Sequence, residues 1–310
     1  MVERLRQKGE NLVQEKLRRS RIMEENFGDV YSESELQATA KKVERAKANF
    51  TNEAFDQDSA EAMELVIFRR MEAEDWFGDF RSPETLIDDQ EDAGPVLLTL
   101  IASETDDILN RTDVILVLNN TYMRNQLISL DVTTTTNRGV LRKKFREARD
   151  GKNLPRGYEN LMFVDTGEEG GFKGGAEMVP HVVVGVEPWL ADDLMALELQ
   201  KEKGPLSAYD RAKLKGLDAK MGYLVVSSVA EQMELILGES EEDQRKLEYF
   251  RQAEKKAWAR LEDEGMGRDR RDRVTQEIGY MSSEMLGISR PTEVSLGRVA
   301  IKGASELAAD

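Results

Sequence analysis

The chain has 310 residues, enough for one large or two small domains. It contains no cysteine and one histidine, His181, which excludes disulfides, zinc–thiolate sites, thiol nucleophiles and any site that needs two histidines. Charged residues make up 34% of the chain and the net charge is −16, which excludes a surface that is basic all round. A local basic groove remains compatible with that charge.

Residues 1–50 are charged and poor in proline and glycine. Gly28 divides them into two predicted helices, and Ser32 or Ser34 is suited to cap the second. Few large apolar residues are present, so solvated helical arms or a coiled-coil-like extension are expected. The first residues lack the apolar segment of a secretory signal, and no run approaches transmembrane length, so we expect a cytoplasmic protein without a membrane partner.

A mostly apolar helix is predicted over residues 58–75, opened by the capping-box spacing of Asp58 and Glu61. Its apolar residues fall on most sides, which is typical of a helix packed into a core. Glu64 lies in the middle of this apolar run. Either Glu64 shares the one solvated stripe of the helix with Glu61, or it is held near a partner inside the protein.

Three short aliphatic runs predict strands over residues 96–102, 113–118 and 127–133. The segment Glu104–Asp107 between the first two is interpreted as an acidic turn. Asp113 begins the second strand, and Asp131 lies within the third. A hairpin-like pairing of these strands would bring the two carboxylates together, and clustered carboxylates repel each other unless a cation lies between them. A hard divalent cation with oxygen ligands is one such cation.

A basic helix is predicted over residues 140–150, after a turn at Asn137-Arg138-Gly139. Eight cations stand between residues 138 and 156 against two acids: Arg138, Arg142, Lys143, Lys144, Arg146, Arg149, Lys152 and Arg156. In an acidic chain, this local excess of positive charge favours a groove for a phosphate backbone near Asp113 and Asp131. The alternative is that these cations balance neighbouring acids in surface ion pairs.

The glycine-rich residues 151–178 are predicted to form a short strand at 161–164 and then a mobile loop that carries Lys173. The aliphatic run 182–186 predicts a central strand. The remaining chain is predicted to be helical over residues 190–199, 207–214, 220–237 and 240–264. The expected organisation is a charged helical extension (1–52), an α/β core (53–200), C-terminal helices (201–264) and a flexible tail (265–310).

The order helix, three strands, basic helix, strand resembles that of the PD-(D/E)xK nuclease superfamily, which has the restriction-endonuclease-like fold. Thr112-Asp113-Val114-Ile115-Leu116 looks like the Pro-Asp element of that superfamily, and Leu130-Asp131-Val132-Thr133 looks like its acid–x–Lys element. The resemblance covers roughly residues 58–190. It implies an α/β (α+β) fold with an α-β-β-β-α-β core and a mixed sheet, flanked by N- and C-terminal helical extensions.

The same resemblance implies metal-dependent hydrolysis of phosphodiester bonds in nucleic acid. Asp113, Asp131 and Glu64 (or Glu61 in its place) would hold Mg²⁺. Thr133 stands where the family carries its catalytic lysine, and threonine cannot serve as a cation. The family sometimes moves this lysine to the following helix, so its role falls to one of two neighbours, Lys143 or Lys144.

Under this reading three arginines of the basic segment would hold the phosphate backbone of DNA or RNA: Arg138, Arg142 and Arg146. The alternative reading is a catalytically inactive nuclease-like fold that acts as a binding or scaffold module. A third reading is an acidic protein that contacts other proteins through its helical extensions, for which self-association without nucleic-acid affinity is expected.

Overall fold

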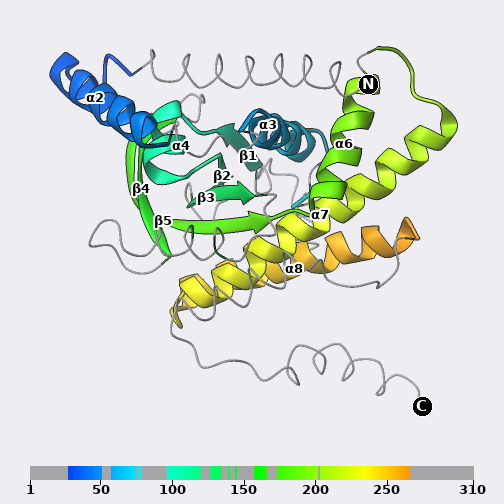
Figure 1. The fold of residues 1–310 in the computed structure, drawn as a ribbon. Helices are drawn as coiled ribbons and strands as arrows, with labels where there is room; N and C mark the ends of the chain where they lie inside the picture. The colour runs from blue at the N-terminus through cyan, green and yellow to red at the C-terminus, as the bar shows by residue number, and fades with distance from the viewer. Residues whose placement is uncertain are drawn as a thin grey trace.

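The computed structural model of the protein describes residues 27–50, 57–74, 76–77, 96–119, 126–133, 139, 144, 157–165, 173–201 and 203–265. These residues form an α/β fold with a mixed sheet (Figure 1). The helices are α2 (Glu33–Phe50), α3 (Gln57–Glu74), α4 (Glu104–Asn110), α6 (Pro188–Lys201), α7 (Ala208–Ile236) and α8 (Glu241–Asp263). The strands are β1 (Val96–Ile101), β2 (Val114–Asn119), β3 (Gln126–Thr133), β4 (Tyr158–Asp165) and β5 (Lys173–Gly185).

The five strands lie in the order β1-β2-β3-β5-β4. The first three form an antiparallel meander, β5 runs parallel to β3, and β4 is antiparallel to β5. The expected mixed α/β sheet is therefore present. The expected central strand at residues 182–186 pairs with β3 on one side only, because β4 pairs with the earlier half of β5 and the Gln232 side chain of α7 bonds to the Val183 backbone on the other side. A parallel neighbour requires a crossover connection, and the chain between β3 and β5 is long enough to provide one.

One face of the sheet is buried by helices. Leu116, Leu130 and Val182 point into a large apolar cluster that also contains residues of α3, α6, α7 and α8. Figure 1 shows α7 running along β5 and α8 packed against α7. The apolar sides of the predicted helix 58–75 are thus explained, because α3 inserts between the sheet and α6.

The opposite face encloses a smaller apolar cluster. Ile115 on β2 and Leu161 on β4 belong to it, although two strands separate β2 from β4 in the sheet. The sheet therefore curls around this cluster, in the manner that strand twist favours. Side chains alternate between faces along a strand, so Ser129 and Asp131 on β3 lie on this curled face, while Leu130 faces the helices.

Two predicted breaks are wrong, and a closely packed glycine lies in each of the two elements concerned. The helices predicted at 207–214 and 220–237 form one helix, α7, in which a Cβ at Gly222 would lie 2.8 Å from Trp76 Cδ1. The predicted loop around Lys173 is the start of β5. There a Cβ at Gly175 would lie 2.8 Å from Tyr31 Oη.

Other boundaries also differ from the prediction. The expected acidic turn Glu104–Asp107 is the beginning of helix α4, and the strand expected at 161–164 extends over all of β4. Asp58 lies within α3 and not before it. Lys144 is helical, as predicted for the basic segment, whereas Gly139, predicted to lie in a turn, is helical too. Within the described residues, no helix combines the length and apolar character that crossing a bilayer requires.

Candidate functional site

Two aspartates face each other at one end of the β2–β3 pair. Asp113 directly precedes β2, and its amide donates to the Leu130 carbonyl at 2.8 Å. The register that pairs Val114 with Leu130 opposes Asp113 to Asp131 at the next position. The Val132 amide donates to Asp113 Oδ2 at 2.6 Å, which orients this carboxylate. The predicted hairpin has therefore brought both carboxylates to the same edge of the curled face.

The ammonium of Lys144 lies against this pair. Lys144 Nζ is 2.6 Å from Asp131 Oδ1, and the Asp131 side chain is only 4% exposed. Burial opposes the charged form of Lys144, but the carboxylates of Asp131 and Asp113, with a smaller contribution from Glu64, outweigh it. The pKa of Lys144 is therefore raised, and the side chain stays an ammonium at neutral pH.

Two further acids lie near Asp113: Glu64 from α3 and Asp107 from α4. One carboxylate oxygen from each of Glu64, Asp107 and Asp113 lies within 4.8 Å of the other two. Glu64 is half-buried between the buried Met63 and Leu65, and its carboxylate faces those of Asp107 and Asp113. Oxygen atoms at this separation are suited to share one hard cation. We call Glu64, Asp107, Asp113, Asp131 and Lys144 the carboxylate–lysine cluster.

The cap of α4 determines where Asp107 lies. Ser103 caps the helix by accepting from the Asp106 amide at 3.0 Å. The buried Asp106 carboxylate accepts from the amides of Met162 and Phe163 on β4 at 2.8 and 2.9 Å, which ties α4 to the sheet. Burial raises the pKa of Asp106 despite these donors. Asp107, the next residue, is thereby held at the cluster by a short, rigid helix.

A buried polar network lies beside Asp131 on the same face. His181 Nδ1 is 2.8 Å from Ser129 Oγ and 3.1 Å from Glu159 Oε1, and Thr112 also donates to Glu159. Burial disfavours both charges, but the mutual attraction of His181 and Glu159 prevails, so the pKa of His181 is raised and that of Glu159 is lowered. Each charge of this buried pair therefore favours the other, and the hydroxyls of Ser129 and Thr112 also donate to Glu159.

The structure brings some of the predicted site residues together, and others lie outside the described residues. The structure brings Glu64, Asp113, Asp131 and Lys144 together. Thr133 is buried at the end of β3 and offers no cation. Four predicted residues lie outside the described residues: Arg138, Arg142, Lys143 and Arg146. The side chain of Glu61 does too.

The sequence pattern does not predict Asp107 as a site residue, because the acids after β1 have the composition of a turn. A sequence signal for α4 exists in the spacing Ser103-x-x-Asp106, which is that of a helix-capping serine followed by an acid in the first turn. Placing Asp107 beside Glu64 nevertheless requires the packing of α3 against β1, because no local pattern relates the two residues.

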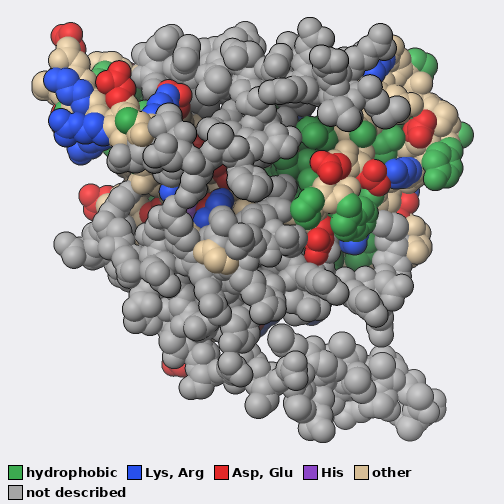
Figure 2. All heavy atoms as spheres, viewed as in Figure 1, with side chains coloured by type: hydrophobic (Ala, Val, Ile, Leu, Met, Phe, Trp, Pro, Cys, Tyr) green, Lys and Arg blue, Asp and Glu red, His purple; other side chains and the backbone are tan. Residues whose placement is uncertain are grey.

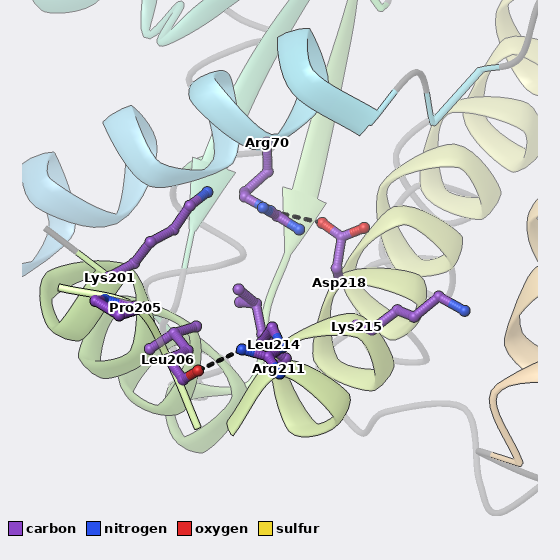
Figure 3. A pocket seen from close by; sticks show the side chains of 8 residues that line it. All are labelled: Arg70, Lys201, Pro205, Leu206, Arg211, Leu214, Lys215 and Asp218. Atoms are coloured by element: carbon purple, nitrogen blue, oxygen red, sulfur yellow. Dashed lines mark hydrogen bonds and ion pairs between the residues drawn. The ribbon is translucent and has the colours of Figure 1, made fainter. Parts of the chain in front are cut away.

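A separate hollow of about 410 Å³ lies between α3, α6 and α7 (Figure 3). Its lining consists of Arg70, Lys201, Pro205, Leu206, Arg211, Leu214, Lys215 and Asp218. The buried Arg70 guanidinium donates from Nε to Asp218 at 2.7 Å, so this charge supports the helix packing. No member of the carboxylate–lysine cluster lines the hollow.

Among known proteins, no family model matches the chain, and neither a curated protein nor a solved structure matches it significantly. The geometry and charge of the carboxylate–lysine cluster are therefore the observations that indicate a function.

Proposed function

We propose that the chain is a divergent metal-dependent nuclease of the PD-(D/E)xK type, which hydrolyses a phosphodiester bond at the carboxylate–lysine cluster. The observation that carries this proposal is the position of Lys144, 2.6 Å from Asp131 and beside carboxylates that converge within 4.8 Å. The acid–x–Lys element of the superfamily likewise places a lysine ammonium beside clustered carboxylates. Here the ammonium comes from the helical segment after β3.

The topology supports this reading. The chain runs from α3 through the meander β1-β2-β3 and a helical segment that contains Lys144 to the parallel strand β5. This order is similar to the α-β-β-β-α-β order of the superfamily, with α4 between β1 and β2 and β4 before β5 as additions. Glu64 belongs to the first helix of that order, and Asp113 and Asp131 belong to its second and third strands.

Electrostatics favours a divalent cation at Glu64, Asp107 and Asp113. Two unit charges 4.8 Å apart interact by about 3 kcal/mol at an effective dielectric constant of about 20. A cation between three ionised carboxylates replaces this repulsion by coordination. Mg²⁺ is suited to the place because it takes few protein oxygens and keeps several waters. When bound, such an ion supplies an activated water and offsets charge on the phosphorane-like transition state.

The protein side chains then have distinct roles. Glu64, Asp107 and Asp113 hold the ion, and the Val132 amide keeps Asp113 oriented toward it. Asp131 fixes the Lys144 ammonium, which donates a hydrogen bond to a non-bridging phosphate oxygen and neutralises part of its developing charge. The attacking water oxygen forms the new bond to phosphorus and gives up a proton to bulk water, the bond to the leaving oxygen breaks, and the leaving oxygen takes up a proton from bulk water.

Calorimetric titration with Mn²⁺ and Mg²⁺ tests the metal site. We expect one ion per chain in the wild type and at least tenfold weaker binding in Asp107→Asn and in Asp113→Asn, since each loses a charged ligand. Asp192→Asn on the exposed side of α6 is the matched control and should bind as the wild type does. A wild type that binds neither ion would contradict the proposal.

Cleavage separates an enzyme from a binding module. Wild-type protein with Mg²⁺ or Mn²⁺ should cut labelled double-stranded DNA, single-stranded DNA or RNA, and chelation of the metal should stop the reaction. Metal binding without cleavage of any of these substrates would favour the inactive binding module.

A further inference from the structure

Helix α2 is fastened directly to the helix that carries Asp107. Lys47 Nζ on α2 lies 2.6 Å from Glu104 Oε1 on α4, three residues before Asp107. The inward side of α2 is formed by the buried Thr39 and Val43, and the helix lies across α4 beside β4 (Figure 1). The outer side of α2 is therefore held at a constant position relative to the carboxylate–lysine cluster.

The segment before α2 strengthens this attachment. Phe27 is fully buried and packs edge-on against Phe163 of β4, with ring centroids 5.1 Å apart. Tyr31 Oη donates to the Met162 carbonyl at 2.6 Å, and Lys173 Nζ at the start of β5 pairs with Asp29 at 2.7 Å. These contacts secure the N-terminal end of α2 to the β4–β5 hairpin.

The exposed side of α2 carries three cations: Lys41, Lys42 and Arg45. Arg45 is four residues from Lys41 and three from Lys42, so the three side chains share one side of the helix. Within the described part of the chain none of them pairs with an acid, whereas exposed lysines and arginines of α7 and α8 commonly do, as Lys213 does with Asp193. Figure 2 shows basic side chains gathered over α2, with acidic side chains beside them.

We infer that this outer face of α2 (Lys41, Lys42 and Arg45) binds the phosphate backbone of a nucleic acid whose scissile bond lies at the carboxylate–lysine cluster. The inference rests on the proposed function and names the surface that holds its substrate. In a chain of net charge −16, most of the surface repels a polyanion, so a group of three cations at a fixed position determines where its backbone approaches. Phosphate contacts of this kind position a substrate and carry no sequence information.

The test measures nucleic-acid affinity without cleavage. Fluorescence anisotropy of a labelled short duplex and of its single strands is followed in EDTA over a range of salt concentrations. For Lys41→Gln/Lys42→Gln/Arg45→Gln we expect at least tenfold weaker binding at low salt. The slope of log K against log salt should fall by about 2 to 3, since each lost phosphate contact removes about 0.9.

A triple variant on α8 is the matched control. Arg245→Gln/Lys255→Gln/Lys256→Gln removes the same charge from three exposed positions of another helix. It should keep the wild-type affinity and slope. Equal losses in both variants would show that only net charge matters and would overturn the inference. Unchanged binding in the α2 variant would overturn it too, as would a wild type that binds no nucleic acid or an α2 surface that captures only an acidic polypeptide.

Failure of this inference is distinguishable from failure of the proposed function. The α2 variant retains every member of the carboxylate–lysine cluster, so its Mn²⁺ affinity should equal that of the wild type. Normal metal binding and cleavage with unchanged anisotropy would reject the α2 surface alone. Absence of metal binding in the wild type would reject the proposed function, whatever the anisotropy in EDTA.

Discussion

Lys144 Nζ lies 2.6 Å from Asp131 Oδ1, although 13 positions separate the two residues in the chain. The position two residues after Asp131 belongs to Thr133, which is buried and uncharged. The cation of the cluster therefore comes from the helical segment that follows β3. The strand β3 therefore supplies the acid, and Lys144, which lies outside that strand, supplies the ammonium.

Lys144→Gln should abolish cleavage and leave metal binding intact. The substitution removes the ammonium that neutralises the phosphate but no metal ligand, and it removes a charge that repels the ion. We expect a fall of at least a hundredfold in the rate constant, as is common when a preorganised charge is lost, with Mn²⁺ affinity equal to or above that of the wild type. Lys255→Gln on α8 is the control. Equal loss of metal binding and cleavage would contradict the assigned role of Lys144.

Asp131→Asn should resemble Lys144→Gln more than it resembles Asp113→Asn. Asp131 holds Lys144, whereas Asp113 belongs to the three carboxylates that converge for a cation. We therefore expect Asp131→Asn to lower cleavage strongly and Mn²⁺ affinity less than tenfold, measured by calorimetry. If Asp131→Asn and Asp113→Asn weaken metal binding equally, Asp131 is itself a ligand.

Metal should stabilise the wild type against heat. Ligand that binds only the folded state, at a concentration about a hundred times Kd, adds about 2.7 kcal/mol to the unfolding free energy. For a protein of this size that corresponds to a rise of about 5 °C in Tm. Differential scanning fluorimetry with Mn²⁺ should show this rise in the wild type and in Asp192→Asn. It should be absent in Asp107→Asn; a full rise there would exclude Asp107 as a ligand.

The ion pair of His181 and Glu159 should make stability depend on pH. The folded pKa of His181 lies above its ordinary value of 6.5, so its contribution is complete below that value and is lost as pH rises through the folded pKa. The folded pKa of Glu159 lies below its ordinary value of 4.5, so its contribution is complete above 4.5 and is lost as pH falls through the folded pKa.

Urea unfolding from about pH 5 to about pH 9 tests this dependence. The unfolding free energy of the wild type should fall on the alkaline side, and that fall should be smaller in His181→Gln. The chain has only one histidine, so the difference reports on His181 alone. Near pH 6 the variant should be less stable by about 3 to 5 kcal/mol, because a buried carboxylate loses its partner. Parallel pH curves for the two proteins would contradict the ion pair.

Asp218 should be the most sensitive carboxylate of the helical layer. It is fully buried on α7 and accepts from Arg70 of α3 and Arg260 of α8, at 2.7 and 2.9 Å. Asp218→Asn leaves the buried Arg70 without this charged partner and should cost about 3 to 5 kcal/mol. Asp193→Asn, which breaks the exposed pair with Lys213, should cost at most about 1 kcal/mol. Similar losses in the two variants, measured by urea unfolding, would contradict this difference.

The sequence is sufficient to predict the strands β1, β2 and β3 and the proximity of Asp113 to Asp131. Alternating and aliphatic runs identify β1, β2, β3 and the end of β5, because a strand that is buried in a sheet needs β-branched and aliphatic residues. Since Asp113 and Asp131 flank the same short hairpin, their proximity follows from local pairing alone. The resemblance to the PD-(D/E)xK superfamily also predicts a lysine beyond Thr133, and Lys144 is one of the two candidates that it offers.

Tertiary packing decided the rest. The break predicted between residues 214 and 220 lies inside α7, and the loop predicted around Lys173 lies inside β5; in these elements Gly222 accommodates Trp76 and Gly175 accommodates Tyr31. These contacts join residues more than a hundred positions apart, and no local pattern encodes them. The meeting of Glu64 with Asp107 likewise depends on the packing of α3 against the sheet and on the tie from Asp106 to β4. Local propensity determines which residues form an element, but long-range packing determines which charges meet.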